Sequence, residues 1–187
     1  MATGTQIPVE QYLSTDYERE PEYIHGEVVE RPMPNLIHSI VQEFLTVRLH
    51  PVGQCCPGLR LRLAKDVFLV PDLSVFVTSR PTEMVPSTPP DIVVEIVSPD
   101  QRYPQFLEKL DECSRWGVPH IWVIEPQMQR FQVYTAGSLT SVLQFGLPER
   151  GFALQARATV RLRQRPVNVI PTARTPAPPA GDRKSVV

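Results

Sequence analysis

Two acidic residues stand inside apolar, strand-like segments, where a carboxylate is costly to bury. Glu95 interrupts the apolar run of residues 92–97, and Asp72 follows Pro71 within the apolar residues 67–77. A buried charge is strongly unfavourable unless an opposite charge or a metal ion compensates for it. Carboxylate oxygens are the preferred ligands of hard divalent cations. The two acids therefore predict a site for Mg²⁺ or Mn²⁺, provided that the two segments are neighbouring strands.

Lys109 is the third residue that could take part in chemistry. It follows Glu95 by 14 positions and belongs to a helix predicted for residues 104–116. Because helical side chains tilt toward the helix N-terminus, Lys109 is expected to reach back toward the end of the Glu95 strand. Two carboxylates that hold a metal ion, with an ammonium group that orients water or stabilises negative charge, are the groups needed for phosphodiester hydrolysis.

Each of these residues also has a purely structural explanation. Asp72 alone fits a turn or bulge residue, and Glu95 alone fits a core acid paired with an arginine. Lys109 alone fits an exposed helix lysine paired with a neighbouring acid. The three together, at this spacing, favour the metal site.

Apolar periodicity and turn residues predict the elements that position these side chains. Helices are expected at residues 7–14, 35–50 and 104–116. A hairpin is expected at residues 23–30 with its turn at His25-Gly26. Residues 67–77 are expected to form one strand or two strand segments hinged at Pro71, and further strands are expected at residues 59–63, 92–97, 120–125, 130–134, 141–145 and 158–163. This order predicts a mixed α/β fold with helices covering a sheet. From residue 166 onward Pro, Ala, Thr and Arg dominate, so we expect one domain over residues 1–165 and a disordered tail over residues 166–187.

Composition excludes several classes of protein. The 187 residues carry a net charge of −1, which gives no general signal for a polyanion partner. No apolar run approaches the roughly 20 residues that cross a bilayer, so no membrane association is expected. The N-terminal residues lack the features of a signal peptide, which predicts a cytoplasmic protein. Three cysteines without CxxC spacing argue against a disulfide framework and against zinc.

The motifs resemble the PD-(D/E)XK nuclease superfamily, and in particular a branch of small bacterial restriction-endonuclease-like proteins whose lysine has moved to the following helix. The residues that carry the resemblance span about residues 20–135; they are Glu22-Tyr23-Ile24-His25-Gly26-Glu27, His38, Pro71-Asp72, Val94-Glu95-Ile96-Val97-Ser98-Pro99, Lys109 and the segment from Gly117 to Pro126. The resemblance implies a restriction-endonuclease-like fold with a central mixed sheet flanked by helices. It also implies endonucleolytic hydrolysis of DNA with Mg²⁺ or Mn²⁺, and a homodimer.

Four further residues are candidates for accessory roles. The resemblance implies that Glu27 is an additional ligand or a water-orienting acid, although a solvated hairpin acid is an equal alternative. His38 is a candidate accessory residue, with a structural histidine as the alternative. Arg60 and Arg62 alternate with apolar residues on one strand, which fits a phosphate-binding stripe or an ordinary solvated strand face.

The sequence also departs from the branch pattern at several positions. Val97 stands where the superfamily pattern has its lysine. His25 and Gln105 replace expected acids, and Cys113 replaces an expected tyrosine. These departures and the near-neutral charge favour an alternative function, a non-catalytic nuclease-fold module that binds nucleic acid or a protein partner.

Overall fold

The computed structural model describes residues 6–155. The strand predicted for residues 158–163 and the tail predicted from residue 166 lie outside the described residues. The elements are α1 (Val9–Ser14), β1 (Glu22–Ile24), β2 (Glu27–Val29), α2 (Leu36–Leu49), β3 (Gln54–Pro57), β4 (Leu61–Ala64), β5 (Val67–Leu69), β6 (Leu73–Phe76), β7 (Ile92–Ile96), α3 (Tyr103–Trp116), β8 (His120–Glu125), β9 (Arg130–Thr135), β10 (Ser138–Val142), β11 (Gln144–Leu147), a 3₁₀ turn (Pro148–Arg150) and β12 (Phe152–Gln155).

The centre of the fold is a six-stranded sheet with the order β10-β9-β8-β7-β6-β3. Strands β7 and β8 run parallel and are connected through α3, whereas the other neighbours are antiparallel. The sheet is therefore mixed, as predicted. Every residue of β7 is buried, which is expected of a strand that is covered on both faces.

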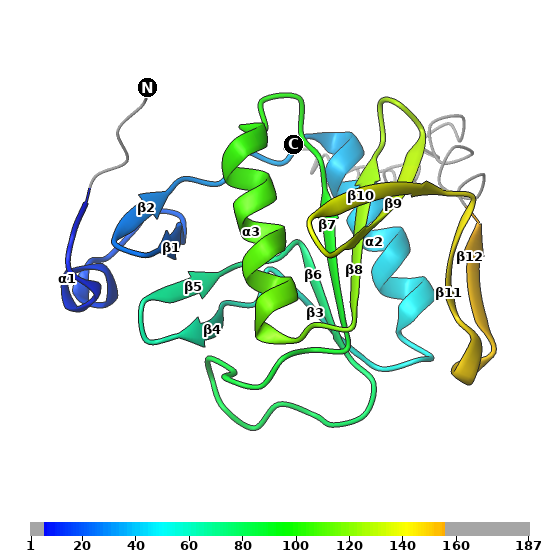
Figure 1. Ribbon diagram of the computed structural model, residues 1–187, viewed down its shortest axis with the longest axis horizontal. Coiled ribbons are helices and arrows are strands. Elements are labelled where there is room, and N and C mark those ends of the chain that lie inside the picture. Colours follow the sequence, from blue (N-terminus) through cyan, green and yellow to red (C-terminus); the bar gives the residue numbers. More distant parts are fainter. Residues whose placement is uncertain (1–5, 156–187) are drawn as a thin grey trace, which may run out of the picture.

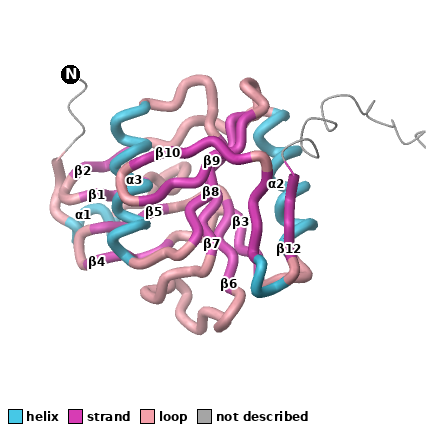
Figure 2. The backbone as a smooth tube through the Cα atoms, turned by 45° about the vertical axis from the view of Figure 1, so that its right-hand side comes forward, coloured by secondary structure: helices cyan, strands magenta, loops and turns pink. Residues whose placement is uncertain are grey.

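Two hydrophobic cores cover the two faces of this sheet. On one face α2 and the hairpin β11–β12 pack against β6, β7 and β8. On the other face α3 and part of a second sheet pack against β7 and β8. Figure 2 shows α2 and α3 on opposite sides of the central sheet. This arrangement confirms the predicted α/β class, with helices flanking a mixed sheet.

The second sheet has four short strands in the order β2-β1-β5-β4, and it lies beside α3 in Figure 1. The chain crosses from this sheet to the central sheet between β5 and β6, at Pro71-Asp72. Proline lacks an N–H donor and is suited to such a break in the ladder. The predicted hairpin turn is also present, because His25 and Gly26 both have positive φ, at 49° and 95°.

No helix among residues 6–155 combines the length and the hydrophobicity needed to cross a membrane.

Candidate active site

A cavity of about 660 Å³ lies where the two sheets, α2 and α3 meet. Its walls come from α1 and the segment after it, the hairpin β1–β2 with the loop that follows, the first turn of α2, the ends of β6 and β7, and the first turns of α3. Elements that are distant in the sequence therefore line one cavity. Asp72, Glu95 and Lys109 all line it.

The pairing of β6 with β7 places Asp72 and Glu95 side by side. Leu73 pairs with Val94 in this antiparallel ladder, so the same register continued by one residue sets Asp72 opposite Glu95. Side chains at directly opposite positions share a face of the sheet. Both acids are buried, at 7% and 5% exposure. The neighbouring strands that the sequence prediction required are present.

Asp72 is held by three groups. Its Oδ2 atom accepts a hydrogen bond from the backbone N–H of Ile96 at 2.8 Å and lies 3.1 Å from Nε2 of His38, while Oδ1 accepts from Arg31 at 3.3 Å. Burial raises the pKa of Asp72, but the His38 hydrogen bond and the nearby charge of Lys109 outweigh it and hold the pKa below its ordinary value. Asp72 is therefore an ionised carboxylate at neutral pH.

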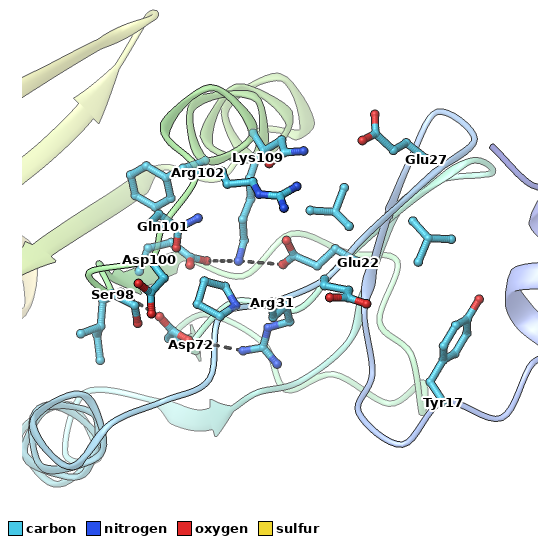
Figure 3. A pocket seen from close by; sticks show the side chains of 18 of the residues that line it. Tyr17, Glu22, Glu27, Arg31, Asp72, Ser98, Asp100, Gln101, Arg102 and Lys109 are labelled. Carbon is cyan, nitrogen blue, oxygen red and sulfur yellow. Dashed lines mark hydrogen bonds and ion pairs between the residues drawn. The ribbon is translucent and has the colours of Figure 1, made fainter. Parts of the chain in front are cut away.

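Lys109 is the cation at the centre of the site. Its Nζ atom lies 2.7 Å from Oε1 of Glu95 and 2.7 Å from Oε1 of Glu22, and it donates to the carbonyl of Val70 at 3.3 Å. Figure 3 shows Lys109 reaching down from α3 to Glu22 and to a second carboxylate. Burial lowers the pKa of Lys109, but Glu22, Glu95 and Asp72 raise it above its ordinary value. The alternative of an exposed, surface-paired lysine is wrong, because only 6% of Lys109 is exposed.

The ionised form of Glu95 is incompletely compensated by its protein neighbours. The pKa of Glu95 is raised to about 8: burial is the largest cause, the charge of Lys109 opposes it, and the charges of Asp72 and Glu22 add to it. A carboxylate in such surroundings is stabilised by an additional cation. The expectation of an arginine partner for Glu95 is wrong, because its partner is Lys109.

Two carboxylates, Asp72 and Glu95, are the side chains of this site that could bind a hard divalent cation. Within residues 6–155 no group of three or more His, Cys, Asp and Glu side chains is arranged to hold a metal ion. Mg²⁺ is commonly bound through one or two carboxylates, with waters and substrate phosphates completing its coordination. Asp72 and Glu95 supply such a pair at one side of a cavity.

Sequence reasoning missed two residues of this site, Glu22 and Arg31. Glu22 stands at the start of the same hairpin motif as Glu27 and precedes the apolar pair Tyr23-Ile24, which was a usable signal for a buried acid. Arg31 lies in the loop after β2, with no local pattern to single it out. Its contact with Asp72 follows only from the packing of the hairpin against the central sheet.

The predicted accessory residues divide into two groups. Glu27 lines the cavity, and His38 both lines it and contacts Asp72. The two arginines of the predicted phosphate-binding stripe do not line it. Arg60 is paired with Glu20 at 2.6 Å, and Arg62 is exposed on β4. Arg60 immediately precedes β4, the edge strand of the second sheet, and Arg62 lies on that strand, so the phosphate-binding stripe stays a prediction for a surface outside the cavity.

The residues that depart from the branch pattern lie in different surroundings. Gln105 lines the cavity on α3. His25 instead lies between Asp66 and Glu112, 3.0 Å from each. Cys113 is fully buried in the core beneath α3, where burial raises the pKa of its thiol.

A mixed sheet with two acids at adjacent strand positions and a lysine on the following helix defines a nuclease-like α/β protein of the restriction-endonuclease-like class. The chain belongs to the Uma2 family, described as "Putative restriction endonuclease", whose model matches residues 9–161. It is similar to a crystal structure of a protein from Anabaena variabilis described as "a putative nuclease". The two are 25% identical with a TM-score of 0.72, and the similarity covers 83% of this chain and 98% of the other. A search of curated proteins gave no match.

Proposed function

We propose that this protein is a divalent-metal-dependent endonuclease that hydrolyses phosphodiester bonds in DNA. The observation that carries the proposal is the buried cluster in which Lys109 lies between two carboxylates and beside Asp72, on the wall of a cavity. The family description supports the class of reaction and, through the word restriction, DNA as the substrate. The resemblance further supports a homodimer, which sedimentation velocity would test.

The residues have separable roles in this proposal. Asp72 and Glu95 would hold Mg²⁺ or Mn²⁺, which when bound supplies Lewis acidity and lowers the pKa of a coordinated water. His38 and the N–H of Ile96 keep Asp72 ionised and oriented. Lys109 is positioned to stabilise negative charge that develops on the phosphate. Arg31, on the same cavity wall, can donate to phosphate oxygens.

The test is cleavage of supercoiled plasmid DNA by the full chain with Mg²⁺ or Mn²⁺. Nicked and linear products are expected, and chelation of the metal should abolish them. Asp72→Asn and Glu95→Gln should each reduce the rate by at least about 100-fold, since each weakens a site on which metal chemistry depends. Glu43→Gln, an exposed change on α2 outside the cavity, is the matched control. Equal trace cleavage by wild type and both site variants would refute the catalytic proposal.

The competing proposal is a nuclease-fold module that binds without cleaving. The ion pairs of the two acids favour this proposal. Arg31 contacts Asp72 and Lys109 contacts Glu95, so the protein itself partly neutralises both carboxylates. Calorimetric titration with Mn²⁺ separates the two proposals. The module predicts no heat of Mn²⁺ binding together with retained, salt-sensitive DNA binding.

A further inference from the structure

Lys109 contacts Glu95, one of the two carboxylates proposed to bind the divalent cation. Its ammonium lies 2.7 Å from Glu95, and it lies at the same distance from Glu22. We propose that Glu22 is a positioning residue that retains the Lys109 ammonium when Glu95 exchanges lysine for a divalent cation. The inference rests on the proposed function, since it concerns the same metal site.

Glu22 is built as a fixed acceptor. It is 5% exposed, and its Oε1 atom accepts from the backbone N–H of Val70 at 2.9 Å as well as lying against Lys109. The carbonyl of Val70 in turn accepts from Lys109 at 3.3 Å. The Glu22 carboxylate, the Lys109 ammonium and the backbone N–H and C=O of Val70 therefore form a closed set of contacts. None of these three contacts involves Glu95.

Electrostatics requires such an alternative acceptor. A divalent cation at Glu95 would lie close to an ammonium that contacts the same carboxylate oxygen, and like charges at this separation repel strongly in a buried site. An ammonium that withdrew from Glu95 without another carboxylate would be a buried, uncompensated charge. Glu22 removes that penalty, because Lys109 would still contact the Glu22 carboxylate and the Val70 carbonyl. The flexible side chain of Lys109 allows its ammonium to move toward them.

Single variants should change Mn²⁺ affinity in opposite directions, measured by calorimetry without DNA. Glu22→Gln should weaken binding by at least about fivefold, because Lys109 must then remain at Glu95 or give up both of the carboxylates that it contacts among residues 6–155. Lys109→Met should tighten binding by a similar factor, because the competing ammonium is gone. Glu30→Gln is the matched control, since it removes the same charge from an exposed position on the cavity wall and should change affinity by less than about twofold.

The double variant decides between retention of the lysine and simple charge effects. If Glu22 acts by retaining Lys109, Glu22→Gln should have almost no effect on Mn²⁺ affinity in the Lys109→Met background. If Glu22→Gln weakens binding equally in both backgrounds, Glu22 acts as a ligand or through its charge alone and the inference is wrong. Circular dichroism of each variant establishes that it is folded.

A crystal structure of wild type with Mn²⁺ gives a second test that needs no variant. The ammonium of Lys109 should stay within hydrogen-bond distance of Glu22 and lie farther than 4 Å, roughly the limit of an ion pair, from Glu95. Lys109 remaining on Glu95 beside a bound ion would overturn the inference and leave the metal-dependent function intact. If wild type binds no Mn²⁺ at all, the proposed function fails, and the inference fails with it.

Discussion

At the scale of single residues, His25 shows how a departure from a family pattern acquires a different role. Its ring nitrogens lie 3.0 Å from Asp66, in the turn between β4 and β5, and 3.0 Å from Glu112 on α3. Arg115 contacts the same oxygen of Glu112 at 2.6 Å. His25 thus connects the hairpin that carries Glu22 to the helix that carries Lys109. The imidazole of His25 gains or loses a proton near neutral pH, so the strength of this connection depends on pH.

The pH dependence of stability tests this connection. Hydrogen bonds to Asp66 and to Glu112 raise the pKa of His25 above its ordinary value. A raised pKa in the folded state means that the stabilisation is complete below the unfolded-state pKa and is lost as pH rises through the folded-state pKa. His25→Asn suits the positive φ at this position. The loss of unfolding free energy caused by His25→Asn should therefore be larger at about pH 5.5 than at about pH 9. The difference between the two losses should be less than about 1 kcal/mol, because His25 is half exposed. Urea denaturation at both pH values measures it, and equal deficits would contradict the assignment.

At the scale of elements, the site depends on how closely β3, β6 and β7 approach one another. Asp72 immediately precedes β6, and its position is fixed from one side by β7 and from the other by α2, where Gln42 donates to the Asp72 carbonyl at 2.6 Å. Asn35 caps α2 by accepting from the N–H of His38. Strand β3 pairs with β6, and Gly53, the residue before β3, packs closely against the backbone of Phe76 at the end of β6.

Gly53→Ala tests the close approach of β3 to β6. A Cβ atom at this position would lie 2.4 Å from the carbonyl oxygen of Phe76, and Gly53 is outside the left-handed region, so the effect is steric. The free energy of unfolding should fall by about 1–3 kcal/mol, the usual cost of overpacking. Gly146→Ala is the control, because its nearest neighbour would be 3.8 Å away, and it should change stability by no more than about 0.5 kcal/mol. Equal stabilities in urea denaturation would show that the backbone relaxes at no cost.

At the scale of the whole molecule, the hairpin β11–β12 closes the core on the α2 side of the sheet. Phe145 stacks on Trp122 with ring centroids 4.6 Å apart and on Phe131 at 4.4 Å. Trp122 comes from β8, which lies next to the Glu95 strand β7, and Phe131 comes from β9, the next strand outward. A hairpin late in the described chain therefore stabilises the sheet on which the site is built.

Phe145→Ala should lower the free energy of global unfolding by about 3–5 kcal/mol, because it leaves a cavity among fully buried aromatic rings. Leu143→Ala, two residues away and 89% exposed, should change it by no more than about 0.5 kcal/mol. Denaturation followed by tryptophan fluorescence and by far-UV circular dichroism measures both. Similar values for the two variants would mean that the hairpin unfolds independently of the sheet.

Much of the fold and part of the site could be predicted because they depend on local patterns. Apolar runs and helical periodicity can be recognised in the sequence without knowledge of tertiary contacts. The helices α2 and α3 and the strands β7 and β8 were therefore expected close to their observed positions. His25-Gly26 required positive φ for a tight turn, and both residues have it. Asp72 and Glu95 were detectable because a charge inside an apolar strand is anomalous at the level of the sequence itself.

The remaining features depend on which distant segments pack together. Lys109 became a buried ion-pair partner only because Glu22 and Glu95, from two different sheets, meet at its ammonium. Arg31, which no local pattern singled out, contacts Asp72. Arg60, which the alternating strand pattern singled out, pairs with Glu20 and does not line the cavity. The amino-acid sequence by itself determined the secondary structure and marked the unusual acids, because both are set by interactions along the chain. Only the tertiary structure decided which cation neutralises which acid, because ion-pair energies depend on distances and burial that arise when separate elements pack together.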